Sequence, residues 1–420
     1  MIEISEKTEY VILCGVSTDD SDDTEKSLDE LEELTDTAGA VTVAKVIQNR
    51  EKVHPGTYIG KGKIDEVAEL VAKTGATGLI CDDELSPAQM KNLSDALDIK
   101  IMDRTMLILD IFAQRASTNE GKIQVELAQL QYRSSRLIGT KNFSRLGGGI
   151  GTRGPGEKKL EEDRRLIRDR ISRLKGELET VKNNREITRS GRKRSNIPVV
   201  AIVGYTNAGK STLLNTLTGA GVLEEDKLFA TLDPTTRLYV TESGFNMMFT
   251  DTVGFIRKLP HHLVDAFRST LEEAKYSDII LHVVDAANPE CYNQMYVVYE
   301  TLERLGAGDK TVITALNKQD IAESTGIKDL HAKKTVKISA KTGAGLEQLI
   351  AAIEDEIKNS RVRIEKLLDY KDAGLVGQIR KYGDLEEEDY REDGIFVRFG
   401  MPKERALSLG LLEKEEKPQY

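Results

Sequence analysis

Apolar and polar positions alternate with two different periods along the first quarter of the chain. The runs "YVILCGV", "VTVAKVI", "TGLICD" and "IKIMD" are almost wholly apolar, whereas apolar residues recur every three or four positions in "DDTEKSLDELEELTD", "KIDEVAELVAK" and "SPAQMKNLSDAL". Buried strands give the first pattern and amphipathic helices give the second. We therefore predict a small α/β domain over residues 1–115. Its basic, glycine-rich "GTYIGKGK" precedes a helix and has the composition of a phosphate-binding loop, but we interpret it as a plain strand-to-helix turn.

A different apolar pattern follows, with spacings of three, four and seven residues. It runs on both sides of a glycine-rich stretch, with Arg164 in a weak d position, through Ile123, Leu127, Leu130 and Leu137 and then Leu160, Ile167, Ile171, Leu174, Leu178 and Val181. Two helices that each carry one apolar stripe pack as an antiparallel hairpin. We predict this hairpin within residues 116–195, with the basic "KNNREITRSGRKRSNIP" as a linker at its end.

Strands and helices alternate again over residues 196–360. The apolar runs are "VVAIVG", "FNMMFTDTVG", "DIILHVVDA", "KTVITALNK" and "KTVKISA". This order predicts a doubly wound parallel sheet. In residues 361–420, "DAGLVGQIRKYG" is typical of a helix and "DGIFVRFG" of a strand, so we predict a small C-terminal α/β domain. The fold class is α/β throughout, apart from the helical hairpin.

Charge is distributed unevenly along the 420 residues, whose formal net charge is −10. Residues 131–198 hold 19 lysines and arginines against 8 acidic residues, a net charge of +11, so the remainder carries −21. Such a basic block predicts a surface for a polyanion on an acidic body. The three cysteines are scattered, and the acidic N-terminus lacks signal-peptide features. We expect a cytoplasmic monomer with no zinc site and no membrane span.

The stretch "RLGGGIGTRGPGE" contains the pattern GxGxxG at Gly149, Gly151 and Gly154. A dinucleotide-binding turn must follow a strand, whereas this stretch follows a predicted helix, so we reject that interpretation. A KH-type RNA loop fails because its flanking strands are missing. With Arg145, Arg153 and no acidic residue between positions 139 and 156, we expect the hairpin tip to contact RNA phosphates. A flexible connector is the alternative.

The stretch "GYTNAGKST" satisfies the phosphate-loop pattern GxxxxGK[ST] in its proper context. It follows the apolar "PVVAIV" and precedes the helical "TLLNTLTG". We expect Lys210 to reach the β- and γ-phosphates and Ser211 to ligate Mg²⁺. Further along, "DTVG" ends a predicted strand, where Asp251 is placed to hold the metal through water and Gly254 to sense the γ-phosphate. Loops at the carboxyl ends of successive parallel strands form one ligand crevice.

The stretch "ALNKQD" indicates which base is bound. Asp320 is placed to accept two hydrogen bonds from guanine, which adenine cannot offer because it lacks the exocyclic amine. Asn317 would brace the loop, Lys318 would lie over the base, and the Ala340 N–H in "ISAK" would face the guanine carbonyl. The sequence therefore predicts GTP and GDP as ligands.

At this point the chain resembles the HflX family of ribosome-associated P-loop GTPases. The resemblance rests on "GGGIGTRGPGEKKLEEDRRLIRDRI", "DRTMLILDIFAQRASTNEGKIQVELAQL", "LFATLDPTTR" and "DTVGFIRKLPHHLVDAF", and it is weakest in the last 60 residues. It implies a G domain that docks on the large ribosomal subunit, a hairpin tip that reaches ribosomal RNA, and in some members the splitting of stalled or dormant ribosomes. It also implies that Thr231 is the switch I threonine, although by spacing alone Thr235 or Thr236 would serve equally.

These arguments define the expected site. Lys210, Thr231 and Gly254 are the expected catalytic residues, and Ser211 and Thr231 are the expected Mg²⁺ ligands. The expected nucleotide-binding residues are Gly204, Tyr205, Thr206, Asn207, Ala208, Gly209, Lys210, Ser211, Phe229, Ala230, Thr231, Leu232, Asp233, Asp251, Thr252, Val253, Gly254, Asn317, Lys318, Asp320, Ser339, Ala340 and Lys341.

Phe255 follows "DTVG", where Ras-like proteins carry the glutamine that orients the attacking water. We therefore expect slow intrinsic hydrolysis that a bound ribosome stimulates. His261 and His262 are candidate donors, although surface or packing roles are expected for both. Three functions fit: a ribosome-splitting or remodelling GTPase, a subunit assembly factor, and a GTP-dependent binding module whose hydrolysis is only a reset.

Overall fold

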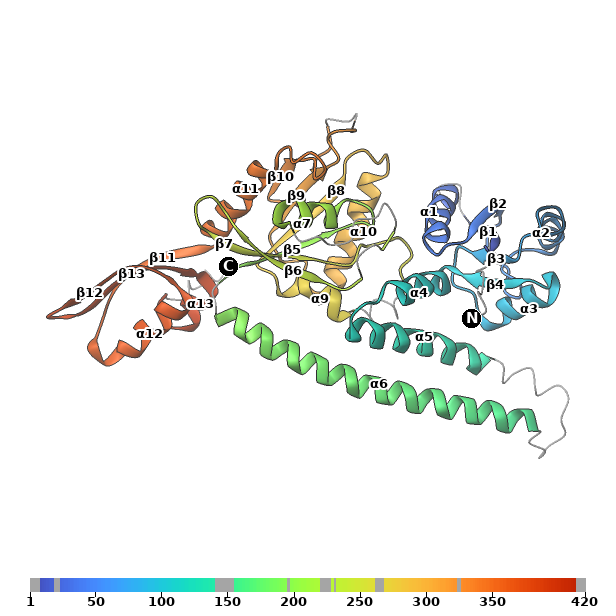
Figure 1. Ribbon diagram of the computed structural model, residues 1–420, viewed down its shortest axis with the longest axis horizontal. Helices are drawn as coiled ribbons and strands as arrows, with labels where there is room; N and C mark the ends of the chain where they lie inside the picture. The colour runs from blue at the N-terminus through green and yellow to red at the C-terminus, as the bar shows by residue number, and fades with distance from the viewer. Residues whose placement is uncertain are drawn as a thin grey trace, which may run out of the picture.

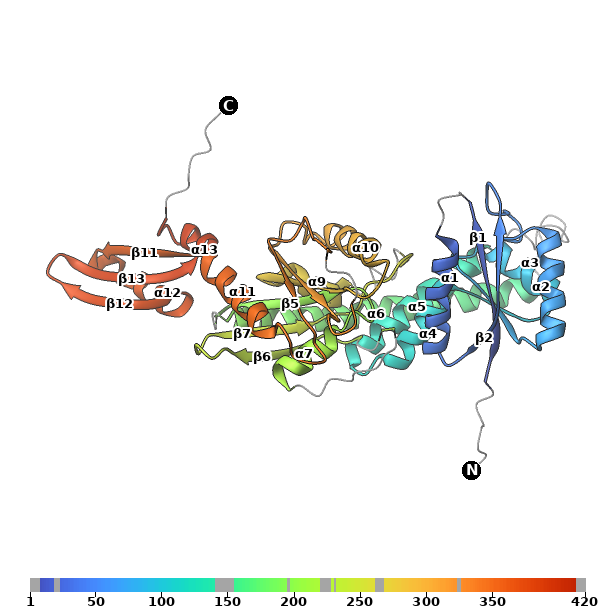
Figure 2. The same ribbon diagram turned by 90° about the horizontal axis from the view of Figure 1, so that it is seen from above.

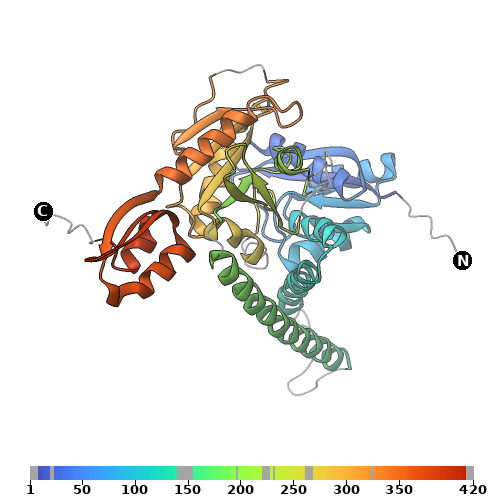
Figure 3. The same ribbon diagram turned by 60° about the vertical axis from the view of Figure 1, so that its left-hand side comes forward.

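The computed structural model describes residues 8–18, 23–139, 155–194, 197–219, 228–229, 232–260, 268–322 and 326–412. An N-terminal domain, a central domain and a C-terminal domain lie in a row, and a pair of long helices runs along one side of the first two (Figure 1). Seen from a third direction, the helix pair projects away from both large sheets (Figure 3). None of the described helices is long and apolar enough to cross a membrane.

The N-terminal domain is a parallel four-stranded sheet between two layers of helices (Figure 2). Its strand order is β2-β1-β3-β4. α1 packs on one face through Leu28 and Leu31, whereas α2 and α3 cover the other through Val67 and Leu93. The predicted turn "GTYIGKGK" does lead into α2, with Gly60 as its N-cap. The elements are β1 (Tyr10–Ser17), α1 (Thr24–Thr37), β2 (Val41–Asn49), α2 (Lys61–Thr74), β3 (Gly78–Cys81), α3 (Pro87–Leu97) and β4 (Lys100–Asp103).

The predicted helical hairpin is present. After α4 (Arg104–Arg115), α5 (Asn119–Gly139) and α6 (Pro155–Arg194) pack through Ile123, Leu127 and Leu174. The predicted basic linker is wrong, because α6 continues through it to Arg194. Lysine, arginine and glutamate are good helix formers, and one interior glycine costs only about 1 kcal/mol, so the helix persists until the approach to Pro198. The glycine-rich tip with Arg145 and Arg153 lies outside the described residues.

The central domain holds a six-stranded sheet in the order β10-β9-β8-β5-β7-β6. Five strands are parallel, as predicted, but β6 is an antiparallel edge strand paired with β7. α9 and α10 cover one face, and α7 and α11 cover the other. The elements are β5 (Val199–Gly204), α7 (Lys210–Thr218), β6 (Thr235–Val240), β7 (Asn246–Asp251), α9 (Arg268–Tyr276), β8 (Ile279–Asp285), α10 (Cys291–Arg304), β9 (Val312–Asn317), β10 (Lys334–Lys337) and α11 (Leu346–Asn359).

The C-terminal domain is a three-stranded antiparallel sheet in the order β11-β13-β12, with helices on one face. Val397 and Phe399 of β13 point into a small core that they share with Ile379 of α12. The predicted helix and strand are both present, which confirms the small α/β domain. The elements are β11 (Arg361–Leu368), a 3₁₀ turn (Tyr370–Asp372), α12 (Ala373–Tyr382), β12 (Asp384–Arg391), β13 (Gly394–Pro402) and α13 (Lys403–Ser408).

One apolar core runs without interruption from the N-terminal domain into the central domain. It joins Leu31 of α1 and Phe112 of α4 to Phe255 and to Val203 of β5. The N-terminal domain, the start of the hairpin and the central domain therefore form a single packed body, whereas the C-terminal domain has a core of its own.

Candidate functional site

The loop between β5 and α7 is held against the neighbouring strands so tightly that two of its positions require glycine. Gly204 has φ +156°, and a Cβ there would lie 2.3 Å from the carbonyl oxygen of Val283 on β8. Gly209 has φ +92°, and a Cβ there would lie 2.3 Å from Nδ2 of Asn317. Any side chain at either position would force the loop open. The loop thus presents backbone N–H groups at the N-terminus of α7, which is a favourable place for a phosphate.

Lys210 supplies a buried positive charge directly after this loop. Its Nζ donates a 2.6 Å hydrogen bond to the Tyr205 carbonyl, and burial lowers the pKa of Lys210 to about 8, although the Asp251 carboxylate opposes the shift. Gly254 comes close on the other side, since a Cβ there would lie 3.0 Å from that Nζ. A buried ammonium that is destabilised by desolvation is stabilised again by an anionic ligand. The fold therefore brings Lys210 and Gly254 together beside the loop between β5 and α7.

Ser211 and Asp251 lie side by side at the same end of the sheet. The Ser211 hydroxyl donates a 2.7 Å hydrogen bond to Oδ2 of Asp251, which is fully buried at the end of β7. Among the described residues there is no group of three or more His, Cys, Asp or Glu side chains to make an all-protein metal cage. Mg²⁺ does not need one, because it takes one or two protein oxygens together with water and phosphate oxygens. The hydroxyl and the carboxylate therefore fit a Mg²⁺ ion held with a nucleotide.

The loops after β9 and β10 are joined to the phosphate loop by Asn317. Its Nδ2 donates to the Ala208 carbonyl at 2.9 Å, and its Oδ1 accepts from the Ala340 N–H at 2.8 Å. Asn317 braces the loops as expected. The Ala340 N–H, which we expected to face guanine, is engaged by Asn317 in this structure.

Asp320 is exposed and is oriented by its neighbour in the fold. The buried Ser339 hydroxyl donates to Oδ1 of Asp320 at 2.7 Å, and this hydrogen bond lowers the pKa of Asp320 below its ordinary value. Lys341 adds an electrostatic contribution in the same direction. Lys318 has φ +61° and pairs with Asp285 at 2.7 Å. An ionised carboxylate with a fixed direction is what bidentate recognition of guanine requires.

Comparison with known proteins agrees with this geometry. Residues 25–113, 115–192 and 199–318 match the families described as GTP-binding GTPase N-terminal, GTP-binding GTPase Middle Region and 50S ribosome-binding GTPase. A GTPase HflX from Lacrimispora saccharolytica is 63% identical over 97% of this chain and 97% of its own length. The GTPase HflX of Escherichia coli is 41% identical over 90% of each chain.

This chain belongs to the HflX family of GTPases. The family resemblance seen in the sequence, the P-loop GTPase fold and GTP hydrolysis as the activity are thereby confirmed. Among solved structures, a GTP-binding protein from Sulfolobus solfataricus in complex with GDP is 26% identical, with a TM-score of 0.45 over 83% of this chain and 98% of that chain.

Some residues expected at the nucleotide of this HflX-family GTPase also have protein partners in this structure. The Phe229 ring is buried edge-on against Phe112, with ring centroids 4.7 Å apart, and Leu232 is buried in the same core. The Asp233 carboxylate binds Ser117 and Thr118 at the start of α5. Core packing therefore fixes Phe229 and Leu232, and hydrogen bonds to Ser117 and Thr118 fix Asp233. The spacing of residues in the sequence does not reveal these contacts. Ala230 and Thr231, including the expected catalytic and metal-ligand role of Thr231, lie outside the described residues.

The two alternative switch I threonines lie on β6. The Thr236 hydroxyl is 2.9 Å from that of Thr250 on β7, so it is used inside the sheet, and Thr235 lies opposite Asp251 in the strand register. The Thr252 hydroxyl donates to the Ile202 carbonyl at 2.8 Å, which gives this side chain a structural role.

Phe255 contributes its backbone rather than its ring. Its carbonyl accepts from the Thr206 N–H at 2.8 Å and its N–H donates to the Gly204 carbonyl at 3.1 Å, while the ring is buried in the core shared with the N-terminal domain. The ring does not offer a water-orienting group. His261 and His262 lie outside the described residues.

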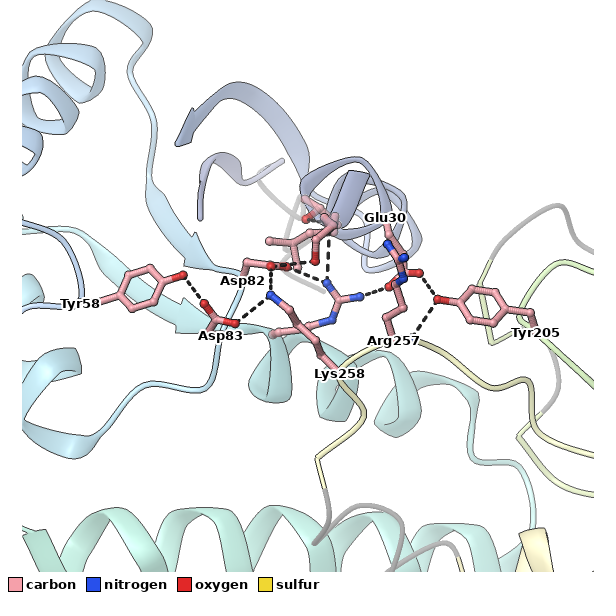
Figure 4. Close-up of polar contacts among 11 residues, drawn as sticks. Glu30, Tyr58, Asp82, Asp83, Tyr205, Arg257 and Lys258 are labelled. Carbon is pink, nitrogen blue, oxygen red and sulfur yellow. Dashed lines mark hydrogen bonds and ion pairs between the residues drawn. The ribbon is translucent and has the colours of Figure 1, made fainter. Parts of the chain in front are cut away.

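Sequence reasoning missed a polar interface between the N-terminal domain and the segment that follows "DTVG" (Figure 4). The Tyr205 hydroxyl contacts the Glu30 carboxylate of α1 and accepts the Arg257 N–H at 2.9 Å. Lys258, which has φ +52°, binds Asp82 and, at 2.8 Å, Asp83 at the end of β3. Carboxylates of the N-terminal domain therefore hold both the loop after β5, through Tyr205, and the segment that follows "DTVG", through Lys258.

Arg104 at the start of α4 also belongs to this interface. It is almost fully buried, contacts Glu30, and binds Asp82 at 2.7 Å. Burial lowers the pKa of Arg104 to about 10, and burial also raises the pKa of Asp82 despite the nearby Lys258. The available sequence signal was the acidic "CDDE" after one strand and the basic "FIRK" after "DTVG", which are complementary in charge.

Proposed function

We propose that this GTPase works on the ribosome, where it binds the large subunit and splits or remodels stalled or dormant particles. The observation that carries the proposal is α6, which spans 40 residues, or about 60 Å, and projects beyond the α/β domains. Arg165, Arg168 and Arg173 are exposed along it. A rigid basic rod on an acidic protein fits a nucleic-acid surface. The match of the central domain to a family of 50S ribosome-binding GTPases supports the same target.

The geometry of the site supports the following division of work. Lys210 and the loop N–H groups would orient the phosphates, Ser211 and Asp251 would hold Mg²⁺, and Asp320 would select guanine. Bound Mg²⁺ would neutralise charge on the β- and γ-phosphate oxygens. Because Phe255 buries its ring, ordering of the attacking water falls to groups that the ribosome fixes or supplies, so the reaction is slow until the protein docks.

Sedimentation tests the proposal. Intact ribosomes are mixed with the protein in GTP, in GDP or in a non-hydrolysable GTP analogue, and the particles are separated on a gradient. We expect the analogue to convert intact ribosomes to subunits, because binding energy alone shifts that equilibrium. Co-sedimentation without splitting would favour a binding module, and selective binding to immature subunits would favour an assembly factor. Failure to bind any particle would overturn the proposal.

A further inference from the structure

The GFIRK segment, residues 254–258, is bridged to the phosphate loop by two backbone hydrogen bonds. The Thr206 N–H donates to the Phe255 carbonyl at 2.8 Å, and the Phe255 N–H donates to the Gly204 carbonyl at 3.1 Å. Gly254 lies in the same contact, since a Cβ there would be 2.9 Å from the Cα of Thr206. The bridge therefore sets where the Gly254 backbone lies beside the phosphate loop.

The Tyr205 side chain extends this bridge by one more hydrogen bond. Its hydroxyl accepts the Arg257 N–H at 2.9 Å and donates to the Glu30 carboxylate of α1 (Figure 4). A hydroxyl has one proton to donate, so the bond to Glu30 leaves the oxygen lone pairs for the Arg257 N–H. Burial raises the pKa of Tyr205 to about 12, so the hydroxyl keeps that proton at neutral pH. Glu30 therefore determines which way the Tyr205 hydroxyl points.

Glu30 is itself held by buried groups of the N-terminal domain. Its other carboxylate oxygen contacts Arg104, and Arg104 binds the buried Asp82 at 2.7 Å. The Ser27 hydroxyl donates to the second oxygen of Asp82 at 2.8 Å. A buried network whose members are paired in this way is rigid. A continuous chain of contacts thus runs from the interior of the N-terminal domain, through Glu30, to the backbone of the GFIRK segment.

We propose that Tyr205 and Glu30 are positioning residues for GTP hydrolysis, which together hold the GFIRK segment so that the Gly254 N–H meets the γ-phosphate. Gly254 is the residue of "DTVG" that we expect at that phosphate. Its placement matters because catalysis of phosphoryl transfer consists largely of donors that are positioned in advance. GDP has no γ-phosphate, so its binding does not use this contact. The inference concerns hydrolysis by the isolated protein and does not depend on the ribosome as its target.

Single-turnover hydrolysis by the full-length protein tests the role of Tyr205. Tyr205→Phe removes only the hydroxyl and leaves the pair of Glu30 and Arg104 in place. At saturating GTP and Mg²⁺ this variant should hydrolyse GTP about three- to tenfold more slowly than the parent, as expected for one lost hydrogen bond. Its Kd for GDP should stay within about twofold of the parent value.

Tyr58→Phe is the matched control. The Tyr58 hydroxyl is buried in the same interface, but it donates to Asp83 at 2.7 Å. Its loss should leave the rate of hydrolysis unchanged. A rate in Tyr205→Phe no lower than that of the parent, an equal loss of GDP affinity, or the same slowing in Tyr58→Phe would overturn the proposal.

Variants of Glu30 separate positioning from simple destabilisation. Glu30→Ala removes the acceptor of the Tyr205 hydroxyl and also takes one carboxylate from Arg104, so it should slow hydrolysis and lower the urea midpoint. Glu30→Gln keeps an oxygen acceptor and should hydrolyse GTP faster than Glu30→Ala. In the Tyr205→Phe background, Glu30→Ala should lower the urea midpoint further but should not slow hydrolysis further, because the hydroxyl that it orients is already absent. Slowing by the same factor in both backgrounds would show that Glu30 acts through stability alone and would contradict the proposal.

Discussion

At the scale of single residues, neighbouring groups and burial shift the pKa values of Asp320 and Lys210 in the structure described here. Asp320 is kept ionised and pointed outward by Ser339. Asp320→Asn should weaken GTP and GDP binding about tenfold or more, because a charge-assisted pair with guanine is lost. A fluorescence titration with both nucleotides measures this. Preference for ATP in the unmodified protein would show that guanine is not the base.

The displaced pKa of Lys210 predicts a pH dependence of binding. Because the pKa is about 8 in the structure described here and phosphate binding raises it, the free lysine loses its proton as the pH rises past 8 while the bound lysine keeps it. Nucleotide affinity should therefore fall above pH 8, by up to about tenfold per pH unit. Nucleotide titrations between pH 7 and 9.5 measure the slope of affinity against pH. Lys210→Ala should bind nucleotide weakly at every pH and should lack this slope. A parent slope equal to that of Lys210→Ala would rule out the lysine as its source.

At the scale of secondary-structure elements, a buried polar network fixes β8 against α10 and β9. Asp329 accepts from the Tyr299 hydroxyl at 2.6 Å and the Thr314 hydroxyl at 2.5 Å, and His282 Nδ1 lies 3.7 Å away. Burial lowers the pKa of His282, although Asp329 opposes the shift. For Asp329, burial acts to raise the pKa, but hydrogen bonds to the carboxylate hold it well below its usual range. The network therefore favours a neutral histidine beside a charged aspartate.

This network should make the central domain sensitive to mild acid. Since the pKa of His282 is lower in the folded protein, the unfolded chain binds the proton first, and stability should fall as the pH drops below about 6.5, by up to about 1.4 kcal/mol per unit. The stability that the hydrogen-bonded Asp329 carboxylate contributes is present above about pH 4 and is lost as the pH falls below that value. Urea unfolding at pH 7, 6 and 5 measures the slope. His282→Gln should flatten it, and the exposed His331→Gln should not.

Some secondary-structure elements and contacts could be predicted from the sequence, and others could not. The phosphate loop and "NKQD" were predictable because each is a contiguous motif whose neighbours are apolar strands. The strand β6 was missed, since a half-exposed edge strand such as "TTRLYV" has no continuous apolar run. The partners of Phe229 and Asp233 were missed for another reason: Phe112 and Thr118 lie more than a hundred residues earlier in the chain, and no local period encodes that choice.

At the scale of the whole molecule, the hairpin is the part expected to meet RNA. Replacing Arg145 and Arg153 with alanine should weaken ribosome binding, reduce its salt dependence by about one unit of slope per lost phosphate contact, and leave basal GTP hydrolysis unchanged. Salt titrations of ribosome binding by parent and variant measure this. Superimposable curves would mean that the tip is only a connector.

The continuous core should also determine how the protein unfolds. Because α1, α4 and the central sheet share one apolar interior, they should lose structure in a single cooperative transition, while the C-terminal domain with its separate interior melts independently. Calorimetry should resolve two heat-absorption peaks, and truncation after residue 359 should remove only one. Deleting the first 115 residues should instead expose Phe229, Phe255 and Leu232 to water and yield an aggregation-prone fragment. The N-terminal domain, the start of the hairpin and the central domain are thus expected to behave as one folding unit, because each leaves part of this shared core uncovered when the others are removed.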